Sequence, residues 1–124
     1  MPVTLLEKMH VYNLQNEITD EIWEKVKGWD FFTKDTLGKQ LTRAFDSIGA
    51  NIAEGYGRFH YGDKIKFYYY ARGSAFESQY WIKRARKRGF FTQEESIKYL
   101  TNIIQINKEL NSLIKSCKFQ KSES

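Results

Sequence analysis

Proline and cysteine are almost absent from this chain, which has one of each, Pro2 and Cys117. Because no proline follows residue 2, no later helix is interrupted by a proline. A single cysteine cannot form an internal disulfide, which fits a reducing compartment. No apolar run approaches the roughly 18 residues that a membrane span requires. Charged residues also interrupt the first 14 residues, where a signal peptide needs an apolar stretch. We therefore expect a cytoplasmic protein without a membrane partner.

Residues that carry catalysis or bind metals are also scarce, because the chain has only two histidines, His10 and His60. Glu7 and His10 have the Glu-x-x-His spacing of di-iron bundles, but such a site needs two of these motifs and two further glutamates. The glycines at 55 and 57 lack both the spacing and the preceding strand of a nucleotide-binding loop. The sequence therefore predicts a protein that is not an enzyme and has no metal and no cofactor.

The positive charge of the chain is concentrated in one segment. The 124 residues, enough for one domain, carry a net charge of +5 and give a pI of about 9.3. Residues 58–88 hold nine Lys or Arg against two acidic residues, so this segment is +7 and the rest of the chain is −2. Such an asymmetry favours an anionic partner.

Apolar residues recur with helical spacing in four segments, at about residues 19–29, 33–55, 63–88 and from 92 onward. Thr19 suits the start of the first helix, Gly55 the end of the second and Gly89 the end of the third. Thr92 and Glu95 form a capping box for the fourth, whose inner side is expected to hold a set of aliphatic residues: Ile97, Leu100, Ile103, Ile104, Leu110 and Ile114. The sequence predicts an all-α, antiparallel up-and-down four-helix bundle spanning residues 1–124, with a less ordered leader (1–18) and tail (119–124).

The helix at 63–88 has two apolar faces. Small residues such as Ala71, Ala75 and Ala85 follow one side, which suits close contact with a neighbouring helix. The opposite side carries Tyr69, Phe76 and Tyr80. A single four-helix bundle covers only one face of a helix, so we interpret these aromatic residues as a self-association surface. The alternative is that they are simply exposed, as many apolar atoms are.

A stripe of polar residues borders the apolar faces of the second and third helices. Its members form the predicted polar seam: Arg43, Ser47, Asn51, Glu54, Ser74 and Glu77. We expect Arg43 to pair with Glu54 or Glu77, and Asn51 to bridge the two helices. A buried network of this kind fixes helix register, so the seam is predicted to be structural.

The basic segment supplies the candidate nucleic-acid-binding residues: Arg58, Lys64, Lys83, Arg84, Arg86, Lys87 and Arg88. The chain has no recognition-helix or RNA-binding sheet motif, so contacts would be made to phosphates, with little sequence preference. The alternative is that the basic residues favour the negative end of a helix dipole, by roughly 0.3–1 kcal/mol each.

Two motifs carry a resemblance to a known family: an Asn-Ile-Ala-Glu-Gly run at residues 51–55 and a Gly-Ser-x-x-Glu motif at residues 73–77. Together with Leu37-x-x-Gln-Leu-x-Arg-Ala before them, they resemble the four-helix-bundle family encoded in intervening sequences of bacterial large-subunit ribosomal RNA genes. The similarity covers nearly the whole chain.

That resemblance implies a homopentamer of helical bundles with no enzymatic activity. It places the family's polar signature on Arg43, Ser47, Asn51, Glu54, Arg58, Ser74 and Glu77. The relatives include the accessory variability proteins of diversity-generating retroelements, which are basic and associate with nucleic acid and with reverse transcriptase. Two functions remain open: a nucleic-acid-associated assembly or accessory factor that binds RNA or DNA, and a scaffold that binds only a partner protein.

Overall fold

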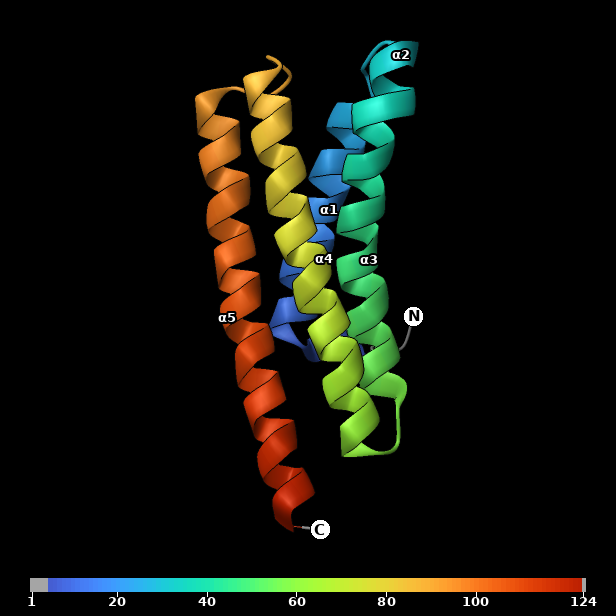
Figure 1. The fold of residues 1–124 in the computed structure, drawn as a ribbon, viewed down its shortest axis with the longest axis vertical. Coiled ribbons are helices and arrows are strands. Elements are labelled where there is room, and N and C mark those ends of the chain that lie inside the picture. Colours follow the sequence, from blue (N-terminus) through green and yellow to red (C-terminus); the bar gives the residue numbers. More distant parts are fainter. Residues whose placement is uncertain (1–4, 124) are drawn as a thin grey trace.

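The computed structural model describes residues 5–123, which form helices joined by short turns (Figure 1). A 3₁₀ turn, Leu6–Lys8, precedes α1, His10–Lys27. The short α2, Phe31–Thr33, continues without a break through a π-helical segment, Lys34–Gly38, into α3, Lys39–Gly57. Two long helices follow, α4, Tyr61–Lys87, and α5, Gln93–Glu123. Counting α2, the π-helical segment and α3 as one rod, residues 5–123 make four rods and contain no strand.

The four rods run antiparallel, and each lies against two neighbours (Figure 1). The helix α1 packs on α3 and α5, and α4 packs on the same two helices from the other side. The predicted all-α four-helix bundle is confirmed. None of the helices among the described residues is both long and apolar enough to cross a membrane.

The core is built mainly from aliphatic side chains around the fully buried ring of Phe45. Burying each such side chain contributes about 1.5–3 kcal/mol relative to leaving it in water. The helix α4 supplies small residues to this core, and Ala71, Ala75 and Ala85 have no exposed surface. The predicted close approach of α4 to its neighbours is therefore confirmed.

The prediction that the first helix begins near Thr19 was wrong. The helix begins at His10, so residues 10–18, assigned to a leader, are part of the bundle. Val11, Ile18 and Ile22 are buried at helical spacing. The start was missed because Met9 precedes the helix without a side-chain capping bond, so the sequence offers no cap signal there.

Two expectations for the last helix also need correction. It continues to Glu123, through most of the segment assigned to a tail. Ile97 and Ile104, predicted to face inward, are more than half exposed, while Ile103, Ile106 and Leu110 are buried. At 100° per residue, Ile97 and Ile104 lie about 120° or more from the centre of the buried stripe, so they cannot share its contacts.

The second rod begins earlier and ends later than predicted, because Asp30 caps α2 and Gly57 is the last residue of α3. Gly55 is helical and buried rather than a flexible stop. A Cβ added at Gly55 would lie 2.8 Å from Cε1 of Tyr68, so the glycine allows α3 and α4 to approach closely. Burial among these helices raises the pKa of Tyr68 to about 12.

Candidate nucleic-acid interface

The end of the bundle where α4 stops and α5 begins, the upper end in Figure 1, is shaped by a tight turn. Gly89 has φ 85°, the left-handed conformation that glycine adopts without strain. The amide of Phe90 donates to the carbonyl of Ala85 at 2.9 Å, which closes the end of α4. The predicted capping box then starts α5, with Thr92 N–H donating to Glu95 at 2.9 Å and Glu95 N–H donating to the Thr92 hydroxyl at 3.1 Å.

Aromatic contacts join this turn to the turn between α1 and α2, which lies at the same end. The ring of Trp29 packs on Phe90 and Phe91, with centroids 5.0 and 5.7 Å apart. Asp30 accepts hydrogen bonds from the Thr33 backbone N–H at 3.0 Å and from its hydroxyl at 2.7 Å, and these bonds lower the pKa of Asp30. The upper end is therefore a fixed platform built from both turns.

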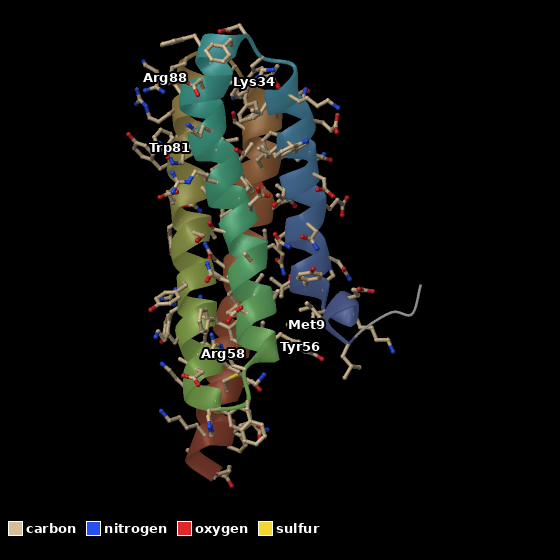
Figure 2. All side chains as sticks on the ribbon, turned by 90° about the vertical axis from the view of Figure 1, so that its right-hand side faces the viewer. Met9, Lys34, Tyr56, Arg58, Trp81 and Arg88 are labelled. Carbon is tan, nitrogen blue, oxygen red and sulfur yellow. The ribbon has the colours of Figure 1, made fainter. Side chains whose placement is uncertain are left out.

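Five of the seven candidate cations lie on the last turns of α4 or, for Arg88, on its C-cap, at this platform: Lys83, Arg84, Arg86, Lys87 and Arg88. No side chain among these five has a hydrogen-bond or ion-pair partner within residues 5–123, and the same holds for Lys34. Figure 2 shows Arg88 and Lys34 near the same end of the bundle. Two carboxylates at this end are already engaged, since Asp35 pairs with Lys39 at 3.7 Å and Glu95 with Lys25. The upper end therefore offers uncompensated cations that suit phosphate oxygens.

The other two candidate cations, Arg58 and Lys64, lie at the lower end and are used by the fold. The Arg58 guanidinium pairs with Glu54 and sits 4.7 Å from the centre of the Phe67 ring. The Lys64 ammonium donates to the backbone carbonyls of Tyr56 at 2.7 Å and Gly55 at 3.4 Å. These bonds satisfy carbonyls at the end of α3. The two groups of cations are about 30 Å apart along α4, at 1.5 Å per residue.

The polar seam is not the buried network that the sequence suggested. Arg43, Glu54 and Glu77 are exposed, and Ser47, Asn51 and Ser74 are half-buried. In the part of the chain that the structure describes, Arg43 and Glu77 have no hydrogen-bond or ion-pair partner. Asn51 donates to the Ser47 carbonyl of its own helix at 2.9 Å, so it does not bridge to α4. The helical wheel placed these residues on one side but could not show that this side faces solvent.

The predicted self-association residues lie on the outer surface of α4. Phe76 is 56% exposed and Tyr80 is 55% exposed. The Tyr69 hydroxyl accepts a hydrogen bond from Lys118 at 2.9 Å, which lowers the pKa of Tyr69. The exposed Ile97 and Ile104 extend this apolar surface onto α5. We call the set Tyr69, Phe76, Tyr80, Ile97 and Ile104 the α4–α5 face.

Sequence reasoning missed a cleft between the π-helical segment and the end of α4. Its volume is about 370 Å³, and its walls combine one cation and one carboxylate with polar and apolar side chains: Asp35, Thr36, Leu37, Gln40, Trp81 and Arg88. The indole Nε1–H of Trp81 is buried and has no hydrogen-bond partner among the described residues. No local motif marks this cleft, because it depends on how the π-helical segment meets α4.

A larger cleft, of about 720 Å³, lies between α1 and α5. Its walls include the carboxylates of Glu17, Asp20, Glu21, Glu24 and Glu95. Two ion pairs cross it, one from Lys98 to Glu21 at 2.8 Å and one from Lys25 to Glu95. The excess of carboxylates makes this cleft unsuitable for a phosphate.

Comparison with known proteins points to a single family. The model of the family described as 23S rRNA-intervening sequence protein matches residues 7–112. A crystal structure of a protein with unknown function from the S23 ribosomal protein family of Bacteroides thetaiotaomicron is 28% identical. Its TM-score is 0.75, and the match covers 85% of this chain and 98% of that one. No curated protein matches.

Proposed function

The chain belongs to the family of 23S rRNA-intervening sequence proteins. We propose the following function, which is argued from the chain's own surface. The protein is a non-enzymatic nucleic-acid-associated factor that binds phosphates through the upper end of the bundle. The resemblance to the accessory variability proteins, which associate with nucleic acid, supports the same function.

The observation that carries this proposal is the group of five cations on α4 without partners in the described chain. An ion pair inside the protein would have to be broken before such a cation could contact a phosphate. Cations without partners incur no such cost, and they release counterions from the nucleic acid when they bind. The contacts reach phosphates rather than base edges, so little sequence preference is expected.

Self-association through the α4–α5 face is part of the proposal, with a pentamer as the expected assembly. Its support is the set of exposed aromatic and aliphatic side chains on α4 and α5, two helices that pack against each other. A closed ring would repeat the upper end once per subunit and so add avidity without a new kind of contact. The same face favours the second candidate function, a scaffold that binds a partner protein and no nucleic acid.

The experiment is a fluorescence-anisotropy titration of a 20-base-pair duplex at about 50 mM salt and then at rising salt. The triple variant R86Q/K87Q/R88Q removes three cations from the upper end. The matched control K8Q/K108Q/K115Q removes three exposed lysines from elsewhere, so both variants fall from +5 to +2.

We expect the upper-end variant to reduce the log–log salt slope by up to about 2.7, at 0.9 for each duplex phosphate that is no longer neutralised. The control should bind like the unchanged protein. Equal weakening by both variants would mean that only net charge matters. No binding to duplex or single-stranded RNA or DNA would overturn the proposal in favour of the scaffold.

A further inference from the structure

Two aromatic rings are exposed at the upper end, the same end of the bundle as the cations without partners. Phe31 is 80% exposed and Phe32 is 74% exposed, in the first turn that follows the Asp30 cap. Leaving two such rings in water forgoes the stabilisation that burial would give. Phe31 and Phe32 lie one helical turn before Asp35 and Thr36, two residues that line the Trp81 cleft, so the rings and the cleft share one side of the second rod.

The Trp81 cleft supplies groups that recognise a nucleotide. The Arg88 guanidinium can bind a phosphate or the acceptor edge of a base, and the Gln40 amide can both donate and accept. Trp81 lines the cleft, and its buried Nε1–H has no acceptor among the described residues. The volume, about 370 Å³, lies within the range of small-molecule pockets.

The wall of the cleft opposite α4 is formed by the π-helical segment, Lys34–Gly38. Such segments inside α-helices are frequent at functional sites. Here the segment carries Asp35, Thr36 and Leu37 to the cleft. Figure 2 shows Trp81 and Arg88 on α4 near the same end of the bundle as Lys34.

We propose that the upper end binds an unpaired segment of RNA or DNA, with bases stacked on Phe31 and Phe32 and one base beside Trp81. Arg84, Arg88 and Lys34 hold the phosphates between these bases. This inference rests on the proposed function and names its substrate class. In a duplex the base faces are covered by their neighbours, so only an unpaired strand can stack on the rings.

The lower end provides the matched control, because it also exposes an aromatic ring, Phe59, at 89%. A cleft there is lined by Phe59, His60, Tyr61, Gly62, Lys64 and Lys121. Its Lys64 is bonded to backbone carbonyls, so the phosphates of a stacked strand would lack that cation. Exposure of an aromatic ring alone therefore does not distinguish the two ends.

The test compares a labelled 20-nucleotide oligothymidine with a 20-base-pair duplex, using the full chain at about 50 mM salt. The variant F31A/F32A should bind the single strand about tenfold or more weakly, since base–aromatic stacking has an effect of that size. Its affinity for the duplex should not change. F59A should change neither affinity. Both variants remove exposed rings, so folding is retained and is checked by circular dichroism.

Trp81→Phe gives a second measurement. It should weaken single-strand binding and reduce the quenching of tryptophan fluorescence that the oligothymidine causes. Equal affinity of F31A/F32A and the unchanged protein for the single strand would overturn this inference and leave the phosphate-binding function standing. Failure of the unchanged protein to bind either nucleic acid would overturn both.

Discussion

The two ends of the bundle have similar residues but use their cations differently. Each has exposed aromatic rings next to Lys or Arg, and sequence reasoning placed candidate nucleic-acid-binding residues at both. At the lower end, Arg58 and Lys64 are held by a carboxylate and by backbone carbonyls. At the upper end, five cations of α4 lack partners in the described chain. The difference teaches that availability for a ligand depends on what already contacts each cation, and a count of charges does not include that.

The largest effect is expected from Phe76→Glu. This variant tests whether the cations of the upper end are repeated in an oligomer that forms through the α4–α5 face. A carboxylate buried in a subunit contact without a partner costs several kcal/mol, so the variant should dissociate to a monomer of about 14.7 kDa. Dissociation of the pentamer should also weaken nucleic-acid binding at the upper end, because the avidity of repeated sites is lost. Light scattering at micromolar concentration measures the mass, with about five times 14.7 kDa expected for the unchanged protein. A monomeric unchanged protein would exclude self-association.

The next effect separates the ends directly through one lysine from each. Lys64→Met should lower the free energy of unfolding by about 1.5–3 kcal/mol, because two carbonyls at the end of α3 lose a charged donor. Lys87→Met should leave stability within about 0.5 kcal/mol, because Lys87 is exposed and has no partner in the described chain.

Urea unfolding measures the stability of these two variants, and the duplex titration measures their binding. Lys87→Met should weaken binding, and Lys64→Met should not. The opposite pattern would reverse the assignment of the two ends.

A smaller effect is expected from Glu54→Ala at the lower end. The Glu54–Arg58 pair is exposed and spans one helical turn, so its loss should cost no more than about 0.5 kcal/mol. A buried polar seam would have implied a larger loss of unfolding free energy for the same substitution. The variant also leaves Arg58 without its carboxylate, so duplex affinity should stay equal or rise slightly. A loss above about 1.5 kcal/mol in urea unfolding would restore the seam as a structural network.

The smallest expected effect is on how folding stability changes at acid pH. Thr33 lowers the pKa of Asp30, and a hydrogen bond from Lys25 lowers the pKa of Glu95, so both carboxyl groups with a lowered pKa in the described chain lie at the upper end. Between the lowered pKa and the ordinary value, the unfolded chain binds more protons than the folded one. Their stabilisation is thus present above the ordinary carboxyl pKa and is lost as pH falls through the folded pKa.

Glu95→Gln should accordingly reduce the slope of the unfolding free energy against pH on the acid side, when urea unfolding is repeated from pH 6 to pH 3. Glu94→Gln is the matched control and should leave that slope unchanged, since Glu94 is exposed and its carboxylate has no hydrogen-bond or ion-pair partner within residues 5–123. An unchanged slope for Glu95→Gln would show that the Lys25 contact does not affect stability.

The sequence predicted the parts of the fold that depend on local signals. The long apolar stripes, the glycine at 89 and the capping box at Thr92 and Glu95 led to the bundle and to the turn between α4 and α5. The start of α1 was missed because Met9 gives no capping bond. The start of α1 thus shows that apolar spacing alone does not locate a helix end that lacks a capping residue.

The candidate site was predicted less completely, for a different reason. The basic residues of α4 were identified by composition, but their freedom from partners depends on contacts between distant helices. Trp81 belongs to no motif, and its cleft arises where the π-helical segment shifts the phase of the second rod against α4. Phe31 and Phe32 fell between the predicted helices at 19–29 and 33–55, because the cap at Asp30 was not recognised. Register between helices cannot be read from the periodicity of either one.

The length of α5 has a practical consequence for attaching the molecule to a surface. The helix begins beside the upper end and runs for 31 residues, about 46 Å at 1.5 Å per residue, to Glu123 at the opposite end of the bundle (Figure 1). A tether joined near Glu123 would therefore orient the molecules uniformly, with the cations of α4 and the Trp81 cleft directed toward the solution. A tether at the turn after Gly89 would bury the same groups against the support.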